Sequence, residues 1–402
     1  MCDIVIMYCN YRRDMDDMSS FTVRRGTRSD LSRYKVGSGM IDYRRKYTFS
    51  PVLLVDERYR QIRSEIFEMD RILGNIILSD KDYVSSMRDA FSANITSTLN
   101  EDGATVGFAD IMDLVNLLHE VDADEIYEMT GLKREIVNYI RTFISASRGG
   151  SMPWNVGGII RVHARLMEGV YSDIEPGVLR SDSYIIPDPS GQPKVVTCPP
   201  EFIKVELQSL LQWVRNTPFD PIATAVIFFA EFVGIRPFKH GNNRVGSTLA
   251  QLIMCTMGLK KIGFTKYEVW VYENRERFQN LLAYCLREQN YAPLIVHICE
   301  SIHDAYVEAI ERLSKKNVLS NADAHMKIIA QRAKDIGSEF SVSDCCRWIP
   351  DVKEQTVRSK LNALVECGVL DRKGNTRNTR YKFIEPFSEL TNPLVDITED
   401  EV

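Results

Sequence analysis

The residues best suited to chemistry lie in one stretch near the middle of the chain, residues 228–247. A nearly uninterrupted apolar run that begins near Pro221 predicts a buried helix, and Gly234 and Pro237 are expected to end it. A short polar loop follows, and a second helix is expected to begin near Asn242. The first turn of a helix has backbone N–H groups without partners, and its dipole favours negative charge. The stretch therefore predicts an anion site between two helices.

The side chains around this loop suit phosphate in particular. The guanidinium of Arg244 offers a planar fork of donors one turn into the second helix. The predicted phosphate-binding or nucleotide-binding residues are Gly241, Asn242, Asn243 and Arg244.

The same stretch resembles the signature of the Fic (Fido) family, His-x-Phe-x-Asp/Glu-Gly-Asn-Gly/Lys-Arg-x-x-Arg. Phe238, Gly241, Asn242 and Arg244 fall on the pattern. Members of the family typically transfer AMP from ATP to a protein hydroxyl. The resemblance covers roughly residues 50–315 in the order of elements, and it implies a mainly α Fic fold, a helical bundle with a β-hairpin flap.

Four positions depart from the signature. Arg236 stands in the place of the histidine, His240 in the place of the acidic residue, Asn243 in the place of Gly/Lys, and Ser247 in the place of the second arginine. The resemblance therefore predicts the fold more firmly than it predicts the chemistry.

The departures remove two groups that AMP transfer needs. A general base must accept the hydroxyl proton, and Arg236 stays protonated at physiological pH. Magnesium prefers hard oxygen ligands, and His240 is a poor substitute for a carboxylate. The sequence thus offers no firm catalytic residue and no metal ligand. ATP is a candidate ligand, and Mg²⁺ is not expected to bind well.

A second segment resembles the inhibitory helix of many Fic proteins, Ser/Thr-x-x-x-Glu-Gly/Asn. One alignment puts Thr96 and Asn100 in the key positions, with Asn in the place of the inhibitory Glu. A shift of one residue puts Ser97 and Glu101 there instead. We prefer the first alignment, and an ordinary helix with a polar face remains the alternative.

The segment 184–196 is expected to form a β-hairpin, because two short β-rich runs flank a Pro/Ser/Gly turn. By resemblance this hairpin is the flap of a Fic protein, which covers the loop and can pair with a target protein by strand addition. A purely structural hairpin is the alternative.

The C-terminal part has the pattern helix, short helix, helix and hairpin, which predicts a winged helix-turn-helix. Residues 352–383 contain eight Lys/Arg and three Glu/Asp, or 8 − 3 = +5, against −5 for the whole chain. The predicted DNA-binding residues are Arg358, Lys360, Arg372, Lys373, Arg377 and Arg380, with Gln355, Thr356 and Ser359 near base edges. The alternative is a winged helix that mediates protein contacts or a homodimer.

Composition is that of an ordinary globular protein, with 44% hydrophobic and 26% charged residues. Nine scattered cysteines without a metal-ligand spacing, and no bilayer-length apolar run, favour reduced thiols, a cytoplasmic location and no membrane partner. The predicted regions are an N-terminal arm (1–48), a helical region with the inhibitory-like segment (49–150), a Fic core (151–316), the winged helix (317–386) and an acidic tail (387–402).

Three functional hypotheses follow. The first is a degenerate Fic protein that retains a phosphate or nucleotide pocket, has lost most or all AMP transfer, and acts in regulation through its winged helix. The second is an active adenylyltransferase, or a transferase that uses another phosphate donor. The third is a DNA-binding regulator in which the Fic unit serves as a dimer scaffold.

Overall fold

The structure is a computed structural model of the 402-residue chain. It describes residues 28–35, 39–43, 49, 51, 53, 57–101, 106–117, 129, 131–147, 154–170, 175–187, 193–374 and 379–384. The predicted arm before residue 28 and the acidic tail lie outside these residues.

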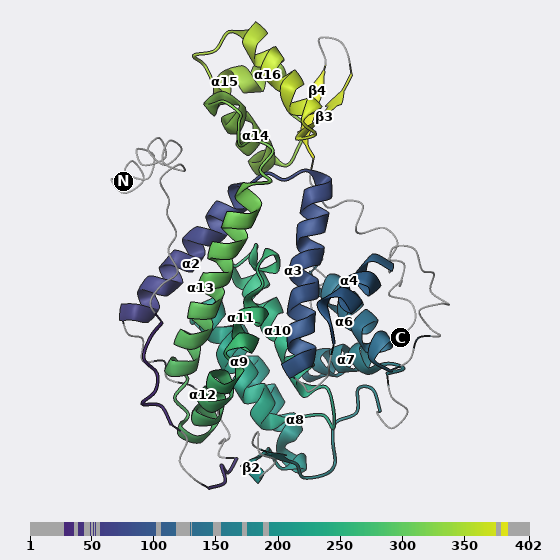
Figure 1. Cartoon of the computed structure of the whole chain (residues 1–402), viewed down its shortest axis with the longest axis vertical. Coiled ribbons are helices and arrows are strands. Elements are labelled where there is room, and N and C mark those ends of the chain that lie inside the picture. Colours follow the sequence, from purple (N-terminus) through teal and green to yellow (C-terminus); the bar gives the residue numbers. More distant parts are fainter. Residues whose placement is uncertain are drawn as a thin grey trace. The chain divides into compact units, whose positions relative to one another are not determined.

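The described elements are mostly helices, as predicted (Figure 1). In chain order they are α2 (Glu57–Asn75), α3 (Asp80–Glu101), α4 (Phe108–Leu117), α6 (Gly131–Ser147), α7 (Val156–Met167), β1 (Ile185–Pro187), β2 (Pro193–Val196), η1 (Pro200–Phe202), α8 (Ile203–Asn216), α9 (Pro221–Ile235), α10 (Asn242–Met257), η2 (Ile262–Phe264), α11 (Tyr267–Glu273), α12 (Arg275–Glu288), α13 (Ala292–Ser314), α14 (Ala324–Ile336), α15 (Val342–Trp348), α16 (Glu354–Glu366), β3 (Leu370–Lys373) and β4 (Arg380–Phe383).

The described chain divides into two compact units. The larger contains Thr27–Arg71 and Ser86–Ala309, and the smaller contains Ile72–Ser85 and Ile310–Leu390. The smaller unit therefore includes a segment far from the C-terminus, which the sequence does not predict.

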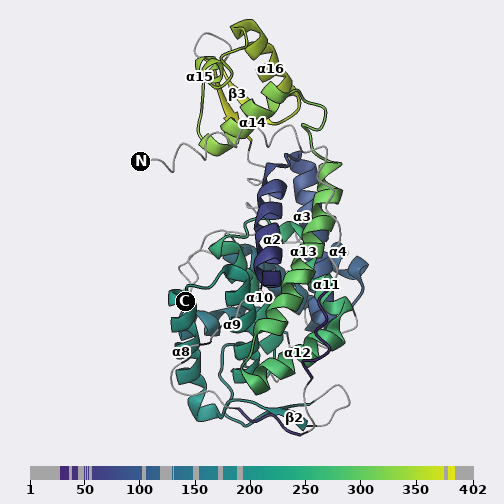
Figure 2. The same cartoon turned by 90° about the vertical axis from the view of Figure 1, so that its left-hand side faces the viewer.

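Helices α9 and α10 form the centre of the larger unit, and they lie side by side in both views (Figures 1 and 2). Almost every residue of α9 is buried, as expected for a helix that is apolar on all sides. Asp220 caps the helix by accepting hydrogen bonds from the N–H groups of Ile222 (3.0 Å) and Ala223 (3.2 Å), and Pro221 occupies the first turn. The predicted start of this helix is confirmed.

The predicted hairpin is present in the larger unit. Strands β1 and β2 pair antiparallel, with Ile185 opposite Val196 and Ile186 opposite Val195. Ile41 adds a single parallel bridge to β2, because its N–H donates to the carbonyl of Lys194 at 2.7 Å. The turn between the strands lies outside the described residues.

In the smaller unit, α14, α15 and α16 pack together, and the antiparallel hairpin β3–β4 lies beside α14 and α16 (Figure 1). Figure 2 shows the same unit from another side. The three helices and the hairpin share one apolar core, which includes Ile329, Cys345, Leu361 and Phe383. Ser341 and Asp344 form a reciprocal capping box at the start of α15. The elements follow the order that the sequence predicts, and their interpretation as a winged helix remains a prediction.

Candidate functional site

The loop between α9 and α10 begins at a residue with a left-handed backbone. Arg236 is the C-cap of α9, with φ 46° and ψ 66°, and its N–H donates to the carbonyl of Phe232 at 2.8 Å. A left-handed conformation is unusual for a side chain with a Cβ atom. We expected Gly234 to help end the helix, but Gly234 lies inside α9, where an added Cβ would meet Leu286 at 2.8 Å. The helix thus ends at Ile235 with Arg236 as its C-cap, and Gly234 allows close packing instead.

Arg180 stabilises the first half of the loop by hydrogen bonds to its backbone carbonyls. Its backbone N–H donates to the carbonyl of Pro237 at 2.9 Å. Its guanidinium donates to the carbonyls of Arg236 at 2.6 Å and Ile235 at 3.1 Å, and to the hydroxyl of Thr197 at 3.0 Å. One buried side chain therefore satisfies carbonyls at the end of α9 and joins them to the base of the flap.

Asn242 holds the second half of the loop. Its Oδ1 accepts from the N–H of Phe238 at 3.0 Å, and its Nδ2 donates to the carbonyl of Phe238 at 2.7 Å. The side chain is buried, so both of its amide atoms serve the fold of the loop.

His163 of α7 packs under the same loop. Its ring stacks on the ring of Phe238, with centroids 3.7 Å apart and planes 7° apart. Its Nδ1 accepts from the N–H of Gly177 at 2.9 Å, so its Nε2–H donates to the carbonyl of His240 at 3.2 Å. Burial lowers the pKa of His163 to about 4. The imidazole is therefore neutral at pH 7, as these two bonds require.

The signature arginine at 244 also points into the protein. Its Nη1 lies 2.6 Å from Oε1 of Glu135 on α6, and the Glu135 side chain is 1% exposed. Gly241, the N-cap of α10, has φ 71°, and a Cβ there would lie 2.8 Å from Cε of Met167. Arg244 and Gly241, two positions that match the signature, thus contact residues of the protein interior.

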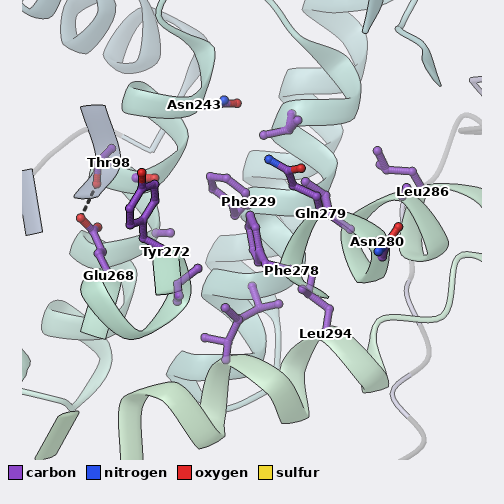
Figure 3. A pocket seen from close by; sticks show the side chains of 18 of the residues that line it. Thr98, Phe229, Asn243, Glu268, Tyr272, Phe278, Gln279, Asn280, Leu286 and Leu294 are labelled. Carbon is purple, nitrogen blue, oxygen red and sulfur yellow. Dashed lines mark hydrogen bonds between the residues drawn. The ribbon is translucent and has the colours of Figure 1, made fainter. Parts of the chain in front are cut away.

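The other side of the loop faces a cavity of about 650 Å³ within the larger unit (Figure 3). Arg236, Asn243 and Ser247 line it, together with the flap and parts of α3 and α9 to α13. The guanidinium of Arg236 lies 4.2 Å from the ring centroid of Tyr184, next to β1. Within the described residues its Nε is buried without a hydrogen-bond partner. An arginine therefore faces the cavity where the family signature has its histidine.

Helix α3 carries the segment that resembles the inhibitory helix, and its predicted residues are engaged locally. Thr96 donates to the carbonyl of Ser92 at 2.8 Å. The side chain of Asn100 bonds both backbone groups of Val106, at 2.9 and 3.2 Å. The side chain of Glu101 lies outside the described residues.

Two neighbours of these residues reach the cavity instead. Ser97 and Thr98 line it, and the hydroxyl of Thr98 bonds the carboxylate of Glu268 on α11 (Figure 3). Tyr267 donates to the other oxygen of Glu268 at 3.0 Å. Burial raises the pKa of Glu268 to about 7. Sequence reasoning missed Glu268, because no motif or spacing distinguishes it from other helical glutamates.

His240 is exposed and does not line the cavity. Among the residues that the structure describes, no three His, Cys, Asp or Glu side chains gather as a metal site would require. At position 240, where the family signature has an acidic residue, an imidazole replaces the hard oxygen ligand that Mg²⁺ prefers. None of the described helices combines the length and hydropathy needed to cross a bilayer.

In the smaller unit, several predicted DNA-binding cations already contact acidic groups. Arg358 lies 2.7 Å from Glu354, Lys373 lies 2.7 Å from Glu339, and Lys360 pairs with Asp323. Arg380 and Arg372 are exposed, and the Nε of Arg372 donates to the carbonyl of Gly374 at 3.2 Å. The candidate base-reading residues Gln355, Thr356 and Ser359 are exposed on α16, and Arg377 lies outside the described residues.

The site thus combines a polar loop between two helices with a neighbouring β-hairpin. The Fic/DOC family model matches residues 153–254, which include the flap, α9 and most of α10. A segment of 119 residues is 28% identical to aq_aa38 of Aquifex aeolicus (strain VF5), which is described as a probable protein adenylyltransferase. That segment covers 29% of this chain and 35% of the relative, so the chain spans about a third of its length.

One solved structure supports the fold, and a second is reported for its similarity alone. A Fic family protein from Desulfovibrio desulfuricans G20 aligns with a TM-score of 0.54 at 20% identity, over 84% of this chain and 98% of that one. Fic-1 (aa134–508) from C. elegans aligns with a TM-score of 0.47 at 15% identity, over 64% of this chain and 72% of that one. Residues 153–254 are thus similar to the Fic/DOC family, and the predicted mainly α Fic fold is confirmed.

Proposed function

We propose that this Fic/DOC protein binds a phosphorylated ligand in its cavity and does not transfer AMP efficiently. The observation that carries the proposal is the position of Arg236, which lines the cavity at the residue where the family signature has its histidine. A guanidinium attracts phosphate and cannot accept a proton from an alcohol. Loss of a general base commonly lowers a rate by roughly two to four orders of magnitude.

The anion is expected to lie between Arg236 and the first turns of α10. Asn243 and Ser247 are four residues apart on that helix, and both line the cavity. The N-terminal end of α10 adds the positive end of the helix dipole and backbone donors. ATP is the reference ligand because the family uses it. The side chain of Arg244 would have to leave Glu135 to take part.

Labelled ATP tests the proposal directly. Purified protein incubated with α-labelled ATP, Mg²⁺ or Mn²⁺ and cell lysate is expected to label neither itself nor another protein above background. Equilibrium binding of ATP or pyrophosphate is expected to be measurable, and Arg236→Gln is expected to weaken it at least fivefold. Strong labelling by the wild type would contradict the loss of transfer.

An active transferase is the second candidate, favoured by the similarity to a probable protein adenylyltransferase. It would use the flap at 184–196 to hold a target segment. The double variant Arg236→His plus His240→Asp separates the candidates. If the wild type is active through its own residues, the double variant reduces that activity. If the wild type is inactive, the double variant either gains transfer or stays inactive.

The smaller unit is proposed to act as a winged helix that contacts DNA phosphates through exposed cations on its hairpin. The support is the exposure of Arg372, Arg380 and Lys382 beside the exposed face of α16. Gel shifts of the full chain over a salt series should show binding that weakens with salt. Arg377→Ala plus Arg380→Ala should remove it, and size measurements on the same samples would reveal a homodimer.

We further propose a cytoplasmic location. The described cysteines are all free, which is consistent with a reducing compartment. Labelling of thiols before and after cell lysis would test this.

A further inference from the structure

The cavity is much larger than the anion site at its edge. It encloses about 650 Å³, within the range of sites that hold a small organic molecule. Arg236, Asn243 and Ser247 occupy only one part of its lining. The rest of the cavity must therefore select the part of the ligand that carries the phosphate.

The buried part of the lining is apolar. Phe229, Phe278, Leu286 and Leu294 converge on the cavity from α9, α12 and α13 (Figure 3). Val233, Met254 and Ile298 lie on the same lining and are almost fully buried. Side chains of this kind bind hydrocarbon and offer no hydrogen bonds.

Away from Arg236, the buried hydroxyl groups on the lining are already bonded within the protein. Ser97 donates to the carbonyl of Ala93 at 3.1 Å, and Thr98 and Tyr267 both bond Glu268. The other polar side chains on the lining are half-buried or exposed, and they include Lys194, Tyr272, Glu276, Gln279 and Asn280. A nucleoside placed among the buried residues would leave its ring nitrogens and hydroxyls with few partners, which is costly.

The two phenylalanines do not form a slot for a base. The rings of Phe229 and Phe278 have centroids 6.0 Å apart and planes tilted by 46°, so they pack against each other. A flat base prefers parallel or edge-on contact with an open ring face. A flexible chain adapts to tilted rings and aliphatic side chains more easily.

We propose that the cavity binds a phosphate or diphosphate ester of a long aliphatic alcohol, with the chain among the apolar residues and the phosphate at Arg236, Asn243 and Ser247. The proposal rests on the proposed function, because it uses the same anion site. It differs in the body of the ligand, which is hydrocarbon and not a nucleoside.

Three probes with the same charged group test the proposal by calorimetry on the full chain. They are farnesyl diphosphate, used below its micelle concentration, ADP and inorganic pyrophosphate. Farnesyl diphosphate is expected to bind at least tenfold more tightly than either of the others, with a more negative heat-capacity change from apolar burial. ADP binding that equals or exceeds farnesyl diphosphate binding would overturn the inference and leave the proposed function standing. If none of the three binds, the proposed function fails as well.

Substitutions at Ala283 and Arg236 test where the hydrocarbon chain and the phosphate of the ligand bind. Ala283 lines the cavity, so Ala283→Phe fills space that the chain would use, and Ala283→Ser at the same site is the control. Ala283→Phe should lower farnesyl diphosphate affinity at least tenfold and leave pyrophosphate binding unchanged, whereas Ala283→Ser should change neither more than twofold. Arg236→Gln should weaken all three probes. If Ala283→Phe does not fold by circular dichroism, Leu286→Asn gives the same comparison. Unchanged farnesyl diphosphate binding in a folded variant of either kind would contradict the proposal.

Discussion

The two sides of the α9–α10 loop differ in what their residues do. On the inner side, Asn242 bonds both backbone groups of Phe238, Arg244 pairs with Glu135, and Gly241 packs on Met167. On the cavity side lie Arg236, Asn243 and Ser247. The residues that match the family signature are those that build the loop, and the departures that line the cavity are those that would meet a ligand. The loop therefore keeps the residues that build it, while the residues that line the cavity differ from the family signature.

The largest predicted difference between the two sides concerns the two arginines. Arg244→Met removes the partner of a carboxylate that is 1% exposed. Breaking a buried pair in this way should lower the free energy of unfolding by about 3–5 kcal/mol. Arg236→Met is the same chemical change on the cavity side, where the stack on Tyr184 contributes about 1 kcal/mol or less.

Urea unfolding of both variants and the wild type, followed by circular dichroism, measures the difference. Equal losses for Arg244→Met and Arg236→Met would remove the distinction between an inner and a cavity side.

The second prediction concerns pH and the inner side. The folded protein holds His163 neutral with a pKa of about 4, below the unfolded value of 6.5. The unfolded chain therefore binds more protons between these values, and stability falls as pH drops from about 6.5 to about 4. The contribution of His163 to that loss should approach roughly 3 kcal/mol.

Melting temperatures of the wild type and His163→Gln at pH 7 and pH 4.5 isolate this contribution. The difference in melting temperature between wild type and His163→Gln should change by several degrees between pH 7 and pH 4.5. His240→Gln is the control, and its melting temperature should follow that of the wild type because His240 is exposed. Parallel pH profiles for wild type and His163→Gln would show that His163 is not held neutral by the loop.

The smallest difference in stability loss is expected between alanine variants of two neighbouring asparagines, Asn242 and Asn243. Asn242→Ala removes two hydrogen bonds to buried backbone groups of Phe238 and should cost about 2 kcal/mol. Asn243 is half-buried and faces the cavity, so Asn243→Ala should cost less than Asn242→Ala, about 1 kcal/mol or less, while it weakens anion binding. Chemical denaturation and pyrophosphate titration of both variants give the two readouts. A larger stability loss in Asn243→Ala would reverse the assignment of sides.

Much of the fold follows from local patterns in the sequence. The apolar run after Pro221 forms α9, and the two β-rich runs within 184–196 pair as the hairpin β1–β2. The three helices and hairpin near the C-terminus also follow the predicted order. The joining of Ile72–Ser85 to that unit depends on long-range packing, which local patterns do not contain.

The site was harder to predict for the same reason. The sequence grouped Asn242, Asn243 and Arg244 as phosphate ligands because they are adjacent. Consecutive helical residues point in different directions, so only Asn243 of the three lines the cavity. The pairing of Arg244 with Glu135 joins residues far apart in the chain. Thr98 and Glu268 meet across α3 and α11 and carry no local signal either.

A crystal structure of the full chain with bound pyrophosphate tests the central claim most directly. We predict that the anion contacts the guanidinium of Arg236 and the side chains of Asn243 and Ser247, while Arg244 stays paired with Glu135. An anion held by Arg244 after it has left Glu135, with Arg236 turned away from the ligand, would contradict the account.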